Sequence, residues 1–169
     1  MTPRAPLIVT ALFGAGDDGW LQQLRRTHYP PERNRVPAHL ILFRHLPPSL
    51  EPELTRRLAA AVAAPPPRAE LGGIIDLGEG TAFRVESREL EAIREALTEA
   101  FHGLLMPQDQ TAWRPHVTIQ NKVEPREARR LQQQLGATFE PRPLAIRALA
   151  SWRYRDGPWE KVREFAFRG

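Results

Sequence analysis

Two histidines lie at the start of apolar segments that are typical of β-strands. His39 is in residues 37–43 (PAHLILF), and His116 is in residues 115–119 (PHVTI). Side chains alternate between the two faces of a strand, so His116 and Thr118 should project together while the apolar residues point into a core. Imidazole titrates near neutrality and serves as a general acid or base. Each segment therefore offers a proton-transfer group that is backed by a hydrophobic core.

Two facing imidazoles suit an in-line displacement at phosphorus. One takes a proton from the attacking water or hydroxyl, and the other gives a proton to the leaving oxygen, while hydroxyls and arginines hold the non-bridging oxygens. This chemistry needs no metal, and the acidic clusters of the chain fall on predicted helices or at their caps. We therefore expect no metal site and no cofactor. The absence of cysteine excludes thiolate nucleophiles, disulfides and cysteine-ligated zinc or iron–sulfur sites.

The composition permits an anionic partner without identifying one. The net charge is +4 and the pI is about 10.3, but 22 of the 24 basic residues are arginines, a skew that a GC-rich coding sequence produces whatever the function. The N-terminal apolar run, residues 7–13, is too short for a membrane span or a signal peptide core. From this we expect a cytoplasmic protein that does not associate with membranes.

Hydrophobic periodicity predicts an alternation of strands and helices. Ser49 and Ser87 are predicted N-caps, and Asp156-Gly157 is predicted to be the turn of a hairpin. We expect strands over residues 7–13, from the His39 segment to Pro47, and over residues 71–77, 81–86, 115–119, 143–154 and 159–167. We expect helices over residues 17–28, from residue 50 to the prolines at 65–67, and over residues 87–104 and 125–136.

The two halves of the chain, roughly residues 1–80 and 81–169, follow the same order of elements. Each runs strand, helix, loop, histidine strand, helix, strand, and the histidine comes about 33 residues after the start of the first strand in one half and about 35 in the other. A duplicated unit that packs about a pseudo-twofold axis brings equivalent strands together. We therefore expect a single α+β domain over residues 1–169, with two pseudo-symmetric lobes. Each lobe would have an antiparallel sheet with helices outside, and the sheets would enclose a central cleft.

The paired histidine segments resemble the motifs of the two-histidine (2H) phosphoesterase superfamily, and most closely its 2'-5' RNA ligase-like, or cyclic phosphodiesterase, branch. The resemblance implies a bilobal fold and action on 2',3'-cyclic phosphates or 2'-5' linkages in RNA or nucleotides. Carried over by position, it implies that His39 and His116 are the acid and the base and that Thr118 holds a phosphate oxygen. The first motif departs from the family pattern, because Ile41 stands where the family has Thr or Ser.

Four further residues are candidates for substrate binding: Arg44, Trp113, Arg114 and Tyr154. Arg44, Tyr154 or a backbone N–H would have to replace the hydroxyl that is missing at Ile41. The sequence predicts a monomeric, metal-independent phosphodiesterase that opens 2',3'-cyclic phosphates of RNA ends or small nucleotides. One alternative is a weakly active or non-catalytic module that binds RNA or nucleotides. In another, the histidines are purely structural. The sequence leaves open which histidine is the acid and which ester bond opens.

Overall fold

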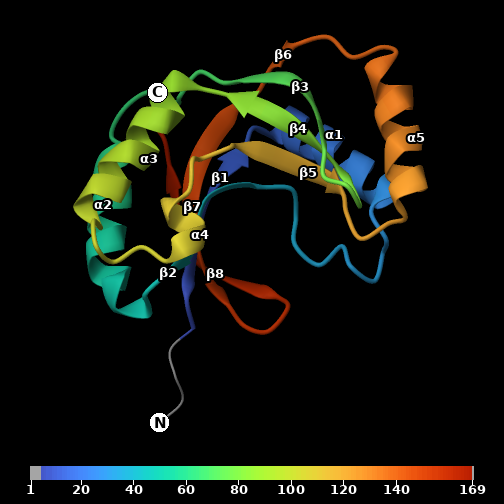
Figure 1. The fold of residues 1–169 in the computed structure, drawn as a ribbon. Coiled ribbons are helices and arrows are strands. Elements are labelled where there is room, and N and C mark those ends of the chain that lie inside the picture. The colour runs from blue at the N-terminus through green and yellow to red at the C-terminus, as the bar shows by residue number, and fades with distance from the viewer. Residues whose placement is uncertain (1–4, 169) are drawn as a thin grey trace.

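The computed structural model describes residues 5–168, in which the strands form two four-stranded antiparallel sheets (Figure 1). This confirms the predicted α+β fold. The first sheet has the order β2-β1-β7-β8, with bounds Leu40–Leu46, Leu7–Phe13, Ile146–Tyr154 and Trp159–Ala166. The second has the order β5-β4-β3-β6, with bounds His116–Gln120, Thr81–Glu86, Glu70–Asp76 and Arg142–Pro143.

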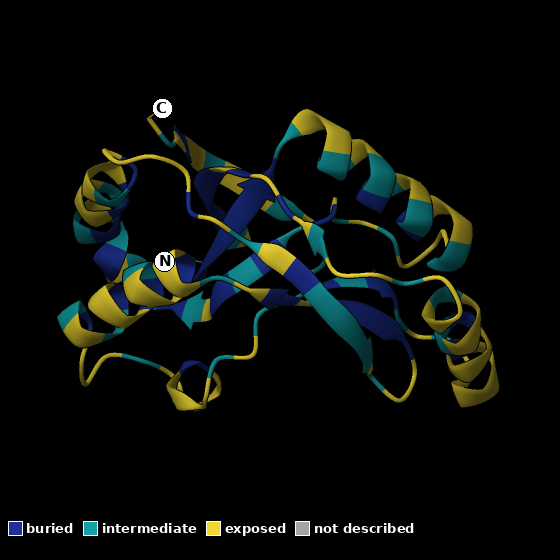
Figure 2. Ribbon diagram, turned by 90° about the horizontal axis from the view of Figure 1, so that it is seen from above, coloured by how far each residue is buried: buried dark blue, intermediate teal, exposed yellow. Residues whose placement is uncertain are grey.

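The helices cover the outer faces of the two sheets. Helix α1 packs against β5, and α5 packs against β3 and β4, while α2 and α3 lie together beside the other sheet (Figure 1). Exposed residues gather on the helices and buried residues along the strands (Figure 2). None of the helices within residues 5–168 is long and apolar enough to span a bilayer. The helices are α1 Ala15–His28, α2 Glu51–Ala61, α3 Arg88–Ala100, α4 Pro107–Gln110 and α5 Pro125–Gly136.

One of the two predicted helix caps is confirmed and the other is wrong. Ser87 caps α3, since its Oγ accepts a hydrogen bond of 3.2 Å from the Leu90 N–H. Ser49 does not cap α2. It lies inside a 3-10 turn, η1 (Pro48–Leu50), where the Leu50 N–H already bonds the Pro47 carbonyl at 3.0 Å. Proline at the first position of this turn starts the helical backbone earlier than the serine.

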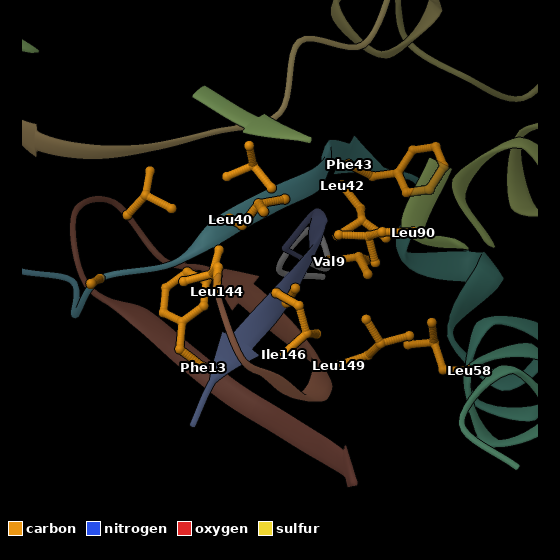
Figure 3. Packing of buried hydrophobic residues seen from close by; sticks show 14 of the residues in the cluster. Val9, Phe13, Leu40, Leu42, Phe43, Leu58, Leu90, Leu144, Ile146 and Leu149 are labelled. Atoms are coloured by element: carbon orange, nitrogen blue, oxygen red, sulfur yellow. The ribbon is translucent and has the colours of Figure 1, made fainter. Parts of the chain in front are cut away.

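Strand β1 is buried along its whole length, because both faces of its sheet are covered. On one face Val9, Phe13 and Leu149 pack with Leu58 of α2 and Leu90 of α3 in the main core (Figure 3). On the other face a second cluster contains Ile8, Leu12, Ala148, Ala150 and Trp152, with Trp159 packed against it. Burial on both sides explains the almost continuous apolar sequence of β1.

The lobes are not the contiguous segments 1–80 and 81–169. Each sheet takes its third strand from the other half of the chain: β3 pairs with β4, and β7 pairs with β1. A turn of four residues, 77–80, joins β3 to β4, and Gly78 adopts a positive φ of 85° there, so the two strands form a hairpin. The predicted strand 143–154 is also divided, because β6 pairs in one sheet and β7 in the other. The exchange keeps the strand order of the two sheets equivalent.

Candidate active site

Both histidines lie where the two sheets meet. Strands β2 and β5 are outer strands of their sheets and contact one another. His39 comes directly before β2, and His116 is the first residue of β5. Both side chains are partly exposed and line one cleft of about 620 Å³, together with Thr118. The fold thus brings together two segments that are 77 residues apart in the sequence.

The two imidazoles are held in the same way. His39 Nδ1 is 2.6 Å from the Pro37 carbonyl oxygen, and His116 Nδ1 is 2.7 Å from the Arg114 carbonyl oxygen. A carbonyl oxygen only accepts hydrogen bonds, so Nδ1 carries a proton in both rings. In the neutral ring Nε2 is then unprotonated and free to accept a proton. Each carbonyl belongs to the residue two positions before the histidine, so the local backbone fixes the tautomer.

The surroundings of His39 favour its neutral form. Burial lowers the pKa of His39 to about 4, although the hydrogen bond to the Pro37 carbonyl acts in the opposite direction. The positive charges of Arg25, His116 and Arg44 act in the same direction as burial and contribute to this value. Trp159 of β8 contributes to the cover, since its ring centroid lies 4.7 Å from that of His39. At neutral pH the His39 ring is therefore neutral in the free protein, with its proton on Nδ1 and none on Nε2.

The cleft is lined mainly by positive charge. Its one acidic lining residue, Asp109, turns its carboxylate toward β2, where the backbone N–H groups of Arg44 and His45 donate to it at 2.8 and 2.9 Å. Arginines in this arrangement attract phosphate and pair with its oxygens. The arginines that line the cleft are Arg25, Arg33, Arg44, Arg94 and Arg114.

Side chains from α3 and from the segment after it bind the free edge of β2. Trp113 Nε1 donates to the Ile41 carbonyl at 2.9 Å, and Arg94 Nε donates to the Leu42 carbonyl at 3.0 Å. Arg94 also binds the Asp109 carbonyl at 2.9 Å. These bonds and those of the Asp109 carboxylate satisfy edge groups that would otherwise be open to another strand. Residues 106–112, between α3 and β5, contain α4 and anchor the strand that follows His39.

The cleft contains all but one of the residues predicted for the site. Arg44, Trp113 and Arg114 line it, and Ile41 lines it from β2 as Thr118 does from β5. Tyr154 is the exception, because it ends β7 with 42% of its surface exposed, outside the cleft lining. Trp159 pairs with Tyr154 in register across the β7–β8 hairpin, and it lines the cleft where Tyr154 does not.

Several residues of the cleft were missed in the sequence, among them an arginine and a tryptophan that lie close to the histidine segments. Arg25 is on α1, and Trp159 is the first residue of β8. Arg25 comes four residues after Leu21, a spacing that places both on one face of a helix. An arginine on the apolar face of an amphipathic helix is unusual, and this was the available signal. For Trp159 the strand pattern alone did not distinguish it from Tyr154.

Comparison with known proteins agrees with this architecture. TT0787 of Thermus thermophilus is 17% identical, with a TM-score of 0.67 over 97% of this chain and 98% of that one. E. coli LigT complexed with 3'-AMP is 19% identical, with a TM-score of 0.61 over 98% and 99%. LigT complexed with NADP+ is 16% identical, with a TM-score of 0.61 over 97% and 98%. At these identities the similarity shows a common fold.

None of the curated proteins matches the chain in sequence. The family model of the 2'-5' RNA ligase superfamily, in contrast, matches residues 15–158, which include both histidine segments, the whole second sheet and strands β2 and β7 of the first. With this match over most of its length, the chain belongs to the 2'-5' RNA ligase superfamily of two-histidine phosphoesterases.

Proposed function

We propose that the protein is a cyclic phosphodiesterase that opens 2',3'-cyclic phosphates at RNA ends or on small nucleotides. The observation that carries this proposal is the pair of imidazoles, held in the same tautomer, in one arginine-lined cleft. Family membership supports phosphoester chemistry in general. The complexes of LigT with 3'-AMP and with phosphate support a phosphate ligand for this fold.

His39 is the base in this proposal, and His116 is the acid. His39 suits the base because burial lowers its pKa to about 4 and leaves Nε2 unprotonated at neutral pH. Its Nε2 takes a proton from the attacking water, whose oxygen forms a bond to phosphorus. The bond from phosphorus to the 2' or the 3' oxygen breaks, and His116, acting in its doubly protonated form, gives the proton of Nε2 to that oxygen. The products are a phosphomonoester and a free hydroxyl.

Thr118 and the cleft arginines stabilise the charge that develops on the phosphate oxygens. The hydroxyl of Thr118 donates to one non-bridging oxygen from the β5 side. Ile41 faces the cleft from the β2 side and has no donor to offer. The positive lining of the cleft therefore has to carry more of this charge than in an enzyme with two hydroxyls.

The direct test measures opening of a 2',3'-cyclic nucleotide by the purified protein in EDTA. Because both proton transfers use imidazole, we expect turnover to persist in EDTA, and His39→Ala and His116→Ala each to lower kcat by about 10²–10⁴-fold. His102→Ala, at an exposed histidine just after α3, is the matched control and should behave like the wild type. A wild type no faster than the two active-site variants would exclude the enzyme.

The alternative is a module that binds RNA or nucleotides without cleaving them. The apolar side chain of Ile41 in the cleft is the observation that favours it. Such a protein would be inactive in the assay above but would still bind a short RNA with an affinity that falls as salt rises, since arginine–phosphate contacts release counterions.

A further inference from the structure

Arg25 places a positive charge in the interior with no carboxylate to neutralise it. Only 3% of its surface is exposed, and within residues 5–168 no Asp or Glu forms an ion pair with it. Burial lowers the pKa of the Arg25 guanidinium, but arginine remains charged at all ordinary pH values. An unpaired buried charge is costly, so its retention calls for a function.

The guanidinium of Arg25 connects the segment before His39 to the strand of His116. Nε donates to Asn34 Oδ1 at 3.1 Å, and Nη2 donates to the Val36 carbonyl at 2.9 Å. Nη1 donates to the Thr118 carbonyl at 2.7 Å, and the group stacks on the Tyr29 ring at 4.4 Å. A guanidinium has five N–H donors, so one on each terminal nitrogen remains available. Arg25 itself lines the cleft.

Arg94 occupies the corresponding place on α3 and provides the natural comparison. It is 9% exposed, lines the same cleft and donates to the Leu42 carbonyl of β2. Unlike Arg25, it has a carboxylate nearby, since the charge of Asp109 raises the pKa of Arg94 against the effect of burial. Arg94 is therefore a buried strand anchor that has the acidic residue Asp109 beside it.

We propose that Arg25 binds the phosphate of the substrate as its internal countercharge and also positions His39 relative to His116. This inference rests on the proposed function, which identifies the bound phosphate as part of the substrate. An anion in the cleft would supply the charge that the protein leaves unmatched and accept the two remaining N–H groups. The planar guanidinium, which binds Asn34, Val36 and Thr118, would fix the position of one histidine segment relative to the other.

Binding of inorganic phosphate, measured by calorimetry, tests the charge without any need for turnover. We expect Arg25→Gln to weaken binding by about tenfold or more, the loss expected for a charge-assisted hydrogen bond. Arg25→Lys, which keeps the charge, should stay within about threefold of the wild type. Arg26→Gln, at an exposed arginine of the same helix that does not line the cleft, is the matched control and should stay within about twofold. Equal affinities for the wild type and Arg25→Gln would overturn the proposal.

A second pair of variants keeps the test decisive if Arg25→Gln fails to fold. Tyr29→Glu places a carboxylate against the guanidinium, and Tyr29→Gln is its uncharged match. A carboxylate at that position would replace the phosphate as counter-ion, so Tyr29→Glu should bind phosphate about tenfold more weakly than Tyr29→Gln. The same affinity in both would show that Arg25 does not hold the phosphate.

Arg25→Lys tests the positioning role, because lysine lacks the planar fork. We expect kcat to fall by about tenfold or more with KM little changed, and the NMR titration of the His39 ring to move. A kcat and a titration like those of the wild type would refute positioning. If the wild type itself has no turnover, the proposed function fails, while phosphate binding and the titration of His39 still decide the role of Arg25.

Discussion

Ile41 and Thr118 occupy equivalent places on β2 and β5, and both side chains line the cleft. Only Thr118 can donate a hydrogen bond to a phosphate oxygen. We therefore expect Ile41→Thr to raise kcat/KM for a cyclic nucleotide. Removing one such donor from an enzyme costs about 2.7–4 kcal/mol, so the gain should lie between about a hundredfold and a thousandfold.

The matched control for this substitution is Ile41→Val. Valine has almost the shape of threonine without its hydroxyl, so it reports the effect of trimming the side chain alone. The test compares kcat/KM for a cyclic nucleotide between the threonine and valine variants under the same conditions. If the threonine and valine variants were equally fast, position 41 would not contact the phosphate, or another group would already serve as the donor.

His39 gives the protein a pH dependence of stability whose sign follows from its pKa. The folded pKa is about 4, below the ordinary value of 6.5, so between these values the unfolded chain takes up the proton first. The contribution of neutral His39 is complete above about pH 6.5 and is lost as the pH falls toward 4. In urea unfolding at pH 7 and pH 5, the stability of the wild type relative to His39→Asn should fall at the lower pH. A constant difference would contradict the depressed pKa.

Among single residues, the sequence was sufficient for those whose function follows from strand alternation. His116 and Thr118 were placed on one face by a period of two, and the structure puts both in the cleft. Arg25 and Trp159 could not be placed in this way. The place of Arg25 in the cleft depends on β5 lying against α1, and that of Trp159 depends on the path of the β7–β8 hairpin.

At the level of elements, α4 stabilises β2 through the side chain of Asp109. Only 2% of this residue is exposed, and its carboxylate accepts the N–H groups of Arg44 and His45. Asp109→Ala would leave both groups buried without partners, so we expect a loss of about 2–5 kcal/mol in the free energy of unfolding. Asp109→Asn, which keeps one acceptor oxygen, should lose less.

Urea denaturation of the three proteins measures this loss. Gln110→Ala, at an exposed residue in the same short helix, is the control and should change the stability by no more than about 0.5 kcal/mol. A stability of Asp109→Ala equal to that of the control would mean that water replaces the carboxylate. The start of α4 was visible in the sequence as Pro107, but the segment is too short for periodicity to reveal a helix.

At the level of the whole molecule, the exchange of β3 and β7 between the lobes was beyond the reach of sequence patterns. The alternation of apolar and polar residues predicts which face of a strand is buried, but it does not specify which other strand it pairs with. The β3–β4 pairing was partly visible, because Gly78 and Gly80 lie in a short turn between two strand patterns. The β1–β7 pairing joins residues about 140 positions apart, such as Thr10 and Ala150, and no local signal specifies it.

This exchange predicts that the two halves of the chain fold only together. Residues 1–80 alone would leave β3 without β4 and β6, and β1 without β7, and residues 81–169 alone would lose the same three pairings. Each fragment would then expose apolar strand edges and too little core to offset its chain entropy. We expect each purified half to lack cooperative thermal unfolding by circular dichroism, and co-expression to restore a complex that unfolds cooperatively. A half that folds by itself would mean that its own strands can form a closed sheet, and the two lobes would then be independent units.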